Sequence, residues 1–379
     1  MDDSVGGTEP KGPSDFELAR RDEVGFLVNK GMSRRGILKR MGITAVMTPP
    51  VVAALSACTG DSKSDVAAKA SSGALAGNGK TIKALEVSFG DVIPWCVQIT
   101  DSMRFWGNMF GVELTHVDGG ATPDSQVKAF EEAANRDDWD LIAVTPVAPN
   151  SLAAIAKQQI DKGVQVIQQA VDIGKPGEDI GYLTFIQQDY EEVGYSLASD
   201  LFTKAGGSGT CIVTQGVAGA SNVVGRSKGV ARALEQFPDM ELLTEAFTDY
   251  SDAESKRLWD SYVQKYPEIS CAVELTAGTA ALNGALAALK SAGREGKTLI
   301  GTNNAEDFAC QAVIDGDISA TIRHSSNLLG MWAAVIGAQY LNGTNTDIPK
   351  DSWMPSQLVS NVTQAESMLA LQQNGLNLV

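Results

Sequence analysis

The sequence predicts an α/β protein built from two doubly wound parallel-sheet lobes. Short runs of about four to seven apolar and β-branched residues recur from residue 82 to residue 322, and stretches with apolar residues at three- and four-residue spacing separate most of them. The apolar runs lack in-out alternation, which indicates strands buried on both faces and joined by right-handed crossovers. About ten such strands are too many for one compact sheet, so two similar lobes are expected.

The expected elements follow each other regularly along the chain. Strands are expected at residues 82–87, 112–117, 141–144, 164–168, 181–186, 211–214, 242–247, 271–275, 298–301 and 319–322. Helices are expected at residues 123–135, 151–162, 191–204, 221–237, 253–266, 280–292 and 305–315. The first series of strands ends near Ile186, and we place the change from one lobe to the other there.

Composition bounds the class of protein. Hydrophobic residues make up 44% of the 379 residues and charged residues 20%, which is ordinary for a globular chain. The net charge of −16 comes from 46 acidic against 30 basic residues, so nucleic acid and anionic lipid are repelled over most of the surface. A nucleic-acid partner is therefore not expected.

The first 57 residues have the pattern of an export signal. Arg34 and Arg35 stand side by side before a short apolar stretch at residues 41–57, the arrangement of a twin-arginine signal. Pro49 and Pro50 interrupt the stretch, and some 17 residues is the lower limit for crossing a bilayer of about 30 Å, so a membrane span is not expected. The alternative is a soluble N-terminal helix with an accidental arginine pair.

The signal ends in a lipoprotein cleavage box. Leu55, Ser56 and Ala57 are the apolar and small residues that precede such a cleavage site, and Cys58 follows them. Cys58 is therefore the expected lipidation site and the first residue of the mature chain, which acyl chains would hold at a membrane. Translation starts at Met1 or at Met32, which is also a plausible start.

Residues 58–79 form the expected tether, because they are rich in Ser, Ala, Gly, Lys and Asp. Cys96, Cys211, Cys271 and Cys310 are widely spaced with no CxxC pair, so no metal cluster is expected. An extracytoplasmic location permits a disulfide but does not imply one, and Cys211 and Cys271 each begin an apolar run, where buried free thiols are common.

Signals of catalysis are poor. The chain has two histidines, His116 and His324, and contains neither a G-x-S-x-G elbow nor an HExxH motif. We therefore expect no enzymatic activity and no cofactor.

From residue 80 onward the chain resembles the ribose-type (type I) periplasmic sugar-binding proteins, the soluble receptors of ABC importers. Residues 215–221 (Gln-Gly-Val-Ala-Gly-Ala-Ser), followed by Arg226 and Gly229, match the family's glycine turn and helix start. Asp189 with Gly194 and residues 284–293 and 314–322 support the match. The resemblance implies two lobes joined by three hinge crossovers, one lobe holding residues 80–186 plus 324–352 and the other 187–323 plus 353–379.

The resemblance also implies a ligand site between the lobes. The family's charged sugar contacts fall on uncharged residues here, namely Ala170, Val171, Val224, Gly278, Thr279, Asn303 and His324. Asp172 could substitute for the first contact with a two-residue shift, and Arg226 corresponds to a family arginine that is structural. Trp95 sits in the family's aromatic loop, where an indole face can stack on a sugar ring.

The expected ligand-binding residues are Trp95, Asp172, Gln188, Asp189, Asn222, Thr279, Asn303 and His324. Asp189 is equally suited to capping a helix, and His324 to bonding the backbone. A buried hydroxyl without a partner costs about 1 to 3 kcal/mol. Either water and neighbouring amides replace the lost charged contacts, or the ligand is less polar than a sugar.

These observations predict a monomeric, membrane-tethered receptor that captures a small neutral solute by lobe closure, outside the cytoplasm, and delivers it to an ABC permease. The solute is a sugar, polyol or related molecule. The alternative is a sensor subunit that signals to a membrane receptor or kinase.

Overall fold

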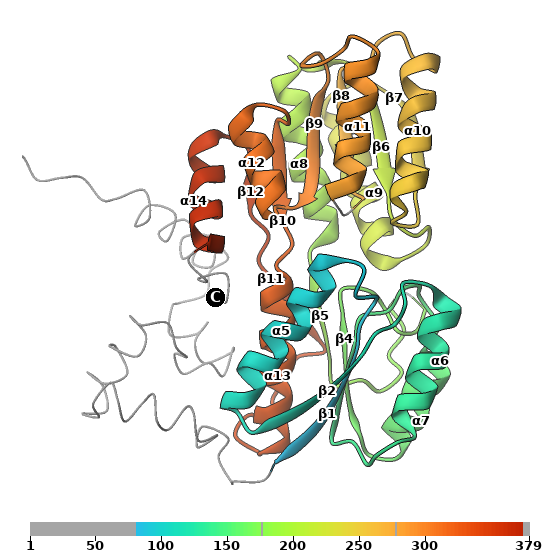
Figure 1. Ribbon diagram of the computed structural model, residues 1–379, viewed down its shortest axis with the longest axis vertical. Coiled ribbons are helices and arrows are strands. Elements are labelled where there is room, and N and C mark those ends of the chain that lie inside the picture. Colours follow the sequence, from blue (N-terminus) through green and yellow to red (C-terminus); the bar gives the residue numbers. More distant parts are fainter. Residues whose placement is uncertain (1–80, 176, 277–278, 374–379) are drawn as a thin grey trace, which may run out of the picture.

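The computed structural model describes residues 81–175, 177–276 and 279–373 (Figure 1). The expected export signal, the expected tether and Cys58 lie outside these residues. The described chain forms two α/β lobes, each with its own sheet, and Figure 1 shows the lobe with helices α8 to α12 above the lobe with α5 to α7.

Sheet one belongs to the lower lobe, which we call lobe one. Its strands lie in the order β11-β5-β4-β3-β1-β2, and all neighbouring pairs are parallel. The bounds are β1 (Ile82–Val87), β2 (Val112–Val117), β3 (Leu141–Val144), β4 (Gln165–Gln169), β5 (Thr184–Gln188) and β11 (Asp351–Met354). Its helices are α5 (Pro94–Met109), α6 (Pro123–Ala134), α7 (Ala153–Asp161) and α13 (Ser326–Leu341).

Sheet two belongs to the upper lobe, lobe two. Its order is β12-β10-β9-β8-β6-β7, with the pair β10 and β12 antiparallel and the other pairs parallel. The bounds are β6 (Ser208–Gln215), β7 (Asp239–Phe247), β8 (Cys271–Glu274), β9 (Leu299–Asn304), β10 (Ala320–Arg323) and β12 (Leu358–Val359). Its helices are α8 (Tyr190–Lys204), α9 (Ser221–Gln236), α10 (Asp252–Lys265), α11 (Thr279–Ser291), α12 (Asp307–Asp315) and α14 (Val362–Gln373).

Helices cover both faces of each sheet, as the absence of alternation predicts. In lobe one, α5 and α13 bury one face and α6 and α7 the other. In lobe two, α8 and α9 cover one face, while α10, α11, α12 and α14 cover the opposite face. The central strands β3 and β8 are buried at every residue, whereas the edge strand β2 is partly exposed. The predicted fold class is therefore confirmed.

Three crossovers join the lobes: β5 to α8, β10 to α13 and β11 to β12. The Nε2 of Gln188, at the end of β5, donates to the carbonyl oxygens of Arg323 (2.8 Å) and Pro355 (3.1 Å). One buried side chain thus connects all three crossovers. Strands β5 and β11 run to Gln188 and Met354, so the expected lobe boundaries at residues 186 and 352 fall inside these strands.

Helices α8 and α9 cross with their backbones in contact. A Cβ added at Gly194 would lie 2.1 Å from the carbonyl oxygen of Arg226, and one at Gly229 would lie 2.0 Å from that of Glu191. Both positions therefore require glycine. This contact explains why two glycines of the sequence motif stand on neighbouring helices.

The four cysteines of the described chain are free and buried. Cys211 and Cys271 lie opposite each other on the paired strands β6 and β8, yet they form no disulfide. Burial raises the pKa of the Cys211, Cys271 and Cys310 thiols to about 12. It also raises the pKa of the Cys96 thiol, so all four are unreactive in the folded chain.

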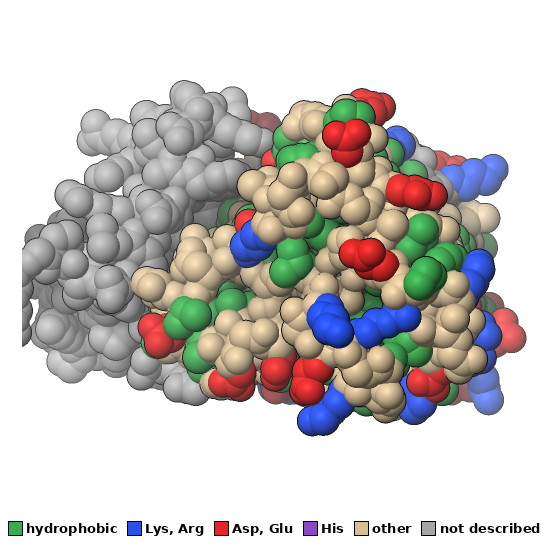
Figure 2. Space-filling view, turned by 90° about the horizontal axis from the view of Figure 1, so that it is seen from above, with side chains coloured by type: hydrophobic (Ala, Val, Ile, Leu, Met, Phe, Trp, Pro, Cys, Tyr) green, Lys and Arg blue, Asp and Glu red, His purple; other side chains and the backbone are tan. Residues whose placement is uncertain are grey.

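The face of lobe two that is seen from above carries both signs of charge (Figure 2). Figure 2, the view from above onto lobe two, shows acidic and basic side chains interspersed with apolar ones. Among the described residues, no helix combines the length and the apolar character that a membrane span requires.

Candidate functional site

The strands of both lobes end at the junction between them, and loops from both sheets line a cavity there. We call it the cleft cavity; its volume is about 50 Å³. Lobe one lines it with residues that follow β1, β3 and β4, and lobe two with residues of α9 and β9 and the loop after β7. The lining residues are Phe89, Ile93, Trp95, Cys96, Thr145, Ala170, Val171, Asn222, Arg226, Tyr250, Asn303, Asn304 and His324. Ligands of open α/β sheets bind at this edge.

The lobes are in contact around the cleft cavity. Val171 of lobe one packs against Ala220 and Val223 of lobe two. The rings of Phe89 and Tyr250, also from opposite lobes, meet edge to face with centroids 5.5 Å apart. The two lobes therefore touch through apolar and aromatic side chains beside the cleft cavity.

Trp95 forms one wall of the cleft cavity. It occupies the first turn of α5, where Pro94 starts the helix without a side-chain cap. Its Nε1 donates to the carbonyl oxygen of His324 at 2.8 Å, and the two rings lie 4.8 Å apart. The indole is thus fixed against the second crossover.

His324 is a buried neutral histidine. Burial, and secondarily the positive charge of Arg226, lowers its pKa well below the ordinary value. Its Nε2 is buried without a hydrogen-bond partner. Such a group costs free energy unless a ligand or water pairs with it.

Two asparagines face the same cavity. The Nδ2 of Asn303 donates to Oδ1 of Asn304 at 2.6 Å, which leaves the Asn303 Oδ1 buried without a partner. The Nδ2 of Asn222 donates to the Tyr250 hydroxyl at 3.0 Å. The structure thus brings together four expected residues, namely Trp95, Asn222, Asn303 and His324.

The other expected residues lie elsewhere. Asp172 is buried outside the cavity lining, and its Oδ1 accepts from the Gly177 amide at 3.0 Å. Asp189 is exposed and caps α8 by accepting from the Glu192 amide at 3.0 Å, which is the role weighed for it as an alternative. Gln188 lies in the hinge. Thr279 begins α11, and its side chain lies outside the described part of the chain, as does Gly278.

Sequence reasoning missed Tyr250 and treated Arg226 as structural. Tyr250 and its neighbour Asp249 both have positive φ, 59° and 49°, and the Tyr250 ring packs over Gly216, where a Cβ would come within 2.0 Å of it. In the sequence, Gly216 is the residue that could have pointed to this ring, because a side chain there would collide with it. Arg226 is buried, donates to the Leu275 carbonyl oxygen at 3.3 Å and lies over the Tyr190 ring, and its Nε is buried without a partner.

The described lining of the cleft cavity carries a single formal charge. Its described lining contains no carboxylate, and its only formal charge is on Arg226, because His324 is neutral. Among the described residues, no group of three or more His, Cys, Asp and Glu side chains is placed to hold a metal ion.

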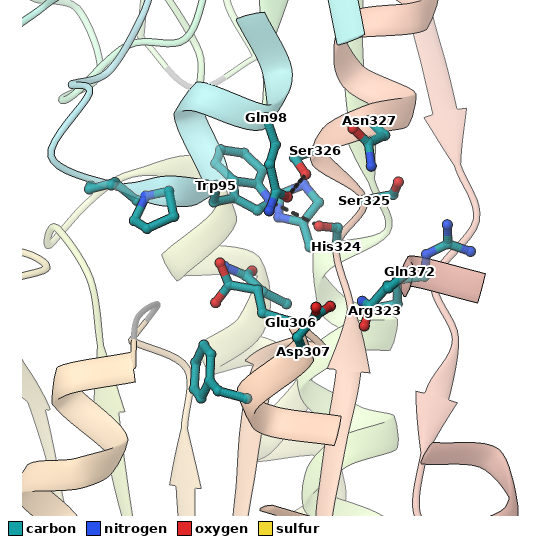
Figure 3. Close-up of a pocket in the computed structure, with 14 residues that line it drawn as sticks. Trp95, Gln98, Glu306, Asp307, Arg323, His324, Ser325, Ser326, Asn327 and Gln372 are labelled. Carbon is teal, nitrogen blue, oxygen red and sulfur yellow. Dashed lines mark hydrogen bonds between the residues drawn. The ribbon is translucent and has the colours of Figure 1, made fainter. Parts of the chain in front are cut away.

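A second, larger cavity adjoins the first, and we call it the side cavity (Figure 3). Its volume is about 220 Å³, and Ile93, Trp95, Asn304 and His324 line both cavities. In Figure 3, Glu306 and Asp307 lie on one side of it and Gln98, Ser326 and Asn327 on the other.

Comparisons with known proteins agree with this architecture. The xylitol-binding protein of Mycolicibacterium smegmatis is 25% identical over 245 residues, which cover 63% of this chain and 66% of that protein, slightly less than two thirds of its length. The crystal structure of a galactofuranose binding protein has a TM-score of 0.69 at 21% identity and covers 78% of this chain and 99% of its own. The fructose-binding periplasmic domain of a hybrid two component system has a TM-score of 0.68 at 21% identity. The match covers 79% of this chain and 96% of that domain's chain.

A family assignment completes the comparison. Residues 87–345 match the periplasmic binding protein domain, which covers more than half of the chain. The proteins of this family bind substrates and are not enzymes. From its two-lobed fold, its interlobe cavity and this match, the chain belongs to the periplasmic binding proteins, as its resemblance to the sugar-binding members implied.

Proposed function

We propose that the chain is the extracytoplasmic substrate-binding lipoprotein of an ABC importer and captures a small neutral sugar, polyol or related solute by lobe closure. The observation that carries the proposal is the cleft cavity, where Trp95 and the unpartnered Asn303 Oδ1 and His324 Nε2 converge from both lobes. The similarity to proteins named for binding xylitol, galactofuranose and fructose supports a polyhydroxylated ligand.

The mechanism follows from the split lining. Asn303 and Asn222 belong to lobe two, and Trp95 and Phe89 belong to lobe one, so a ligand touches both sets only when the lobes are closed. Closure is driven by this difference in contacts between the two states. A micromolar affinity corresponds to about −8 kcal/mol. A few hydrogen bonds and one stacked indole supply a free energy of this size.

The ligand is identified by a thermal-shift screen of pentoses, hexoses, polyols and nucleosides, followed by calorimetric titration. Trp95→Ala and Asn303→Ala should each weaken binding of the best ligand about tenfold or more without unfolding the protein. Trp353→Ala is the matched control, because Trp353 is 56% exposed on the edge strand β11. Unchanged affinity in both cleft variants would remove this site.

The tether and the partner require their own test. Cys58→Ala should release the protein from the membrane fraction, and Lys replacements of Arg34 and Arg35 should block its export. Liganded protein should stimulate ATP hydrolysis by the cognate permease in proteoliposomes, whereas the ligand-free protein should not. Retention of Cys58→Ala at the membrane would contradict the lipid anchor.

Sensing is the second candidate function, because the same fold occurs in the periplasmic domain of a hybrid two component system. A sensor subunit would bind the same ligand but copurify with a receptor or kinase instead of a permease. Crosslinking in intact cells distinguishes the two partners.

A further inference from the structure

The side cavity has walls from both lobes and the second crossover. Gln98 and Ser326 come from α5 and α13 of lobe one, and Asn304, Glu306 and Asp307 come from lobe two. Gln98 and Ser326 are held together by a hydrogen bond of 2.7 Å from the serine hydroxyl to the amide oxygen. The side cavity, like the cleft cavity, is therefore lined by residues of both lobes.

Glu306 is the most informative side chain of the side cavity. It stands at the N-cap position of α12, where an acidic side chain ordinarily accepts a backbone N–H, yet it makes no capping hydrogen bond. Its Oε2 is buried without a partner. Burial, and secondarily the neighbouring Asp307, raises the pKa of this carboxyl to about 7. The carboxyl thus has no structural role at the helix start and faces the cavity.

The remaining polar groups of the walls are suited to hydroxyl groups. The Gln372 Oε1 is buried without a partner, because the amide is turned so that its Nε2 donates to the Ala305 carbonyl oxygen at 2.7 Å. Arg323 adds a positive charge to the two carboxyls, so the walls hold both signs. A hydroxyl group can donate a hydrogen bond to a carboxylate and accept one from a guanidinium. An ion of either sign would be repelled by the groups of like charge in these walls.

The two cavities adjoin at Trp95 and His324. Both side chains line both cavities, and the His324 Nε2 is buried without a partner at this boundary. The cleft cavity, with about 50 Å³, is the smaller compartment, and the side cavity has about 220 Å³. A unit bound in the first would therefore lie next to a unit bound in the second.

We propose that the side cavity is a second subsite that binds a hydroxylated unit attached to the unit held in the cleft cavity. The ligand is then a neutral two-unit compound of the disaccharide or glycoside class, with Glu306 accepting a hydrogen bond from a hydroxyl of its second unit. This inference rests on the proposed function, since it extends the same ligand.

The test uses calorimetric titration of the whole chain with matched pairs of probes: D-xylose and xylobiose, D-galactose and lactose, and D-fructose and sucrose. At least one two-unit sugar should bind about tenfold more tightly than its single-unit partner, a difference of about 1.4 kcal/mol. Glu306→Gln should weaken binding of that two-unit sugar about tenfold and leave the single-unit affinity unchanged. Trp95→Ala should weaken both.

Two further variants keep the result interpretable. Asp307→Asn changes an exposed side chain of the same wall, so it tests the subsite even where Glu306→Gln unfolds the protein. Glu131→Gln, on the exposed face of α6, is the control and should change neither affinity.

The outcomes separate the inference from the function on which it rests. Equal affinities within each pair, with Glu306→Gln and Asp307→Asn lacking effect, would overturn the second subsite and leave the proposed function standing. A preference for the two-unit sugar that both variants leave intact would place its second unit elsewhere and overturn the inference as well. Failure of every sugar and polyol to bind would remove the proposed function and the inference together.

Discussion

The indole Nε1 of Trp95 donates a hydrogen bond of 2.8 Å to the main-chain carbonyl oxygen of His324. This bond attaches the first turn of α5 to the second crossover, and it fixes a side chain that lines both cavities. One tryptophan therefore combines a contact surface for the ligand with a connection to the hinge.

These two roles can be separated by substitution. Trp95→Phe keeps an aromatic face but removes the donor, so we expect the free energy of unfolding to fall by about 1 kcal/mol while much of the ligand affinity is retained. Trp95→Ala removes both and should weaken binding about tenfold or more. Denaturant unfolding and calorimetric titration measure the two effects. Equal affinity losses in both variants would mean that stacking contributes nothing.

The two histidines should titrate very differently. Both ring nitrogens of His116 are hydrogen-bonded to carboxylates, Nδ1 to Glu86 and Nε2 to Asp91 at 2.9 Å. The Glu86 carboxylate contributes most and raises the pKa of His116 to about 9, whereas burial lowers the pKa of His324 well below 6.5. Since the chain has two histidines, NMR should show one imidazole titrating near pH 9 and one that stays neutral above pH 6.5.

The same histidine gives a stability prediction. A pKa that is raised in the folded state means that the native protein holds this proton more tightly than the unfolded chain. The stabilisation by charged His116 is therefore fully present below about pH 6.5 and is lost as the pH rises through about 9. His116→Gln should be less stable than the parent protein at pH 6 and closer to it at pH 10. A difference that is constant over this range would show that no charge is involved.

The buried Glu274 should make the stability of lobe two depend on pH. It is buried on β8, where the Thr214 hydroxyl and the Trp259 indole donate to its two oxygens, and burial raises its pKa to about 7. The native state then retains a proton that the unfolded state releases, so stability falls as the pH rises from 4.5 through about 7. The free energy of unfolding should fall by about 3 kcal/mol over this range, because each pKa unit corresponds to about 1.4 kcal/mol.

Glu274→Gln removes this titration while keeping the shape of the side chain. Its amide oxygen can accept from Trp259 and its amide nitrogen can donate to Thr214, so the stability gained over the parent protein should grow between pH 5 and pH 8. Chemical denaturation at four pH values measures it. A gain that does not change with pH would contradict the raised pKa.

The contact between α8 and α9 can be tested with one added methyl group. Gly194→Ala and Gly229→Ala place a Cβ about where a backbone oxygen lies, at 2.1 and 2.0 Å, and each should destabilise lobe two by about 1 to 3 kcal/mol or more. Gly284→Ala on α11 is the control, because its Cβ would meet Lys256 at an ordinary 3.4 Å. Alanine also favours a helix by up to about 1 kcal/mol over glycine, so the control should be as stable as the parent or more stable. Thermal unfolding ranks the three variants.

Much of the fold was predictable because the signals were local. Buried parallel strands read as short apolar runs, and amphipathic helices such as α10 carry a clear period. Helix α13 was not among the expected elements. It is largely buried and apolar on most sides, so its sequence lacks the alternation of apolar and polar residues that marks an amphipathic helix. Strand β12 has two residues, too few for any pattern.

The candidate site was predictable only in part. Trp95, Asn222, Asn303 and His324 follow strands or begin helices at the expected edge, so position along the chain was enough to find them. Tyr250 depends on a left-handed backbone and on the space above Gly216, and neither is visible in residue periodicity. Asp172 was expected at the site from a shifted motif, and it instead bonds the Gly177 amide of its own loop.

The buried free thiols make the chain its own reporter of local opening. Alkylating reagents react with the thiolate, and these sulfurs become accessible only when the surrounding structure opens. Cys96 belongs to lobe one, and Cys211, Cys271 and Cys310 belong to lobe two. The labelling rate of each cysteine-containing peptide, followed by mass spectrometry, therefore shows which lobe opens locally more often.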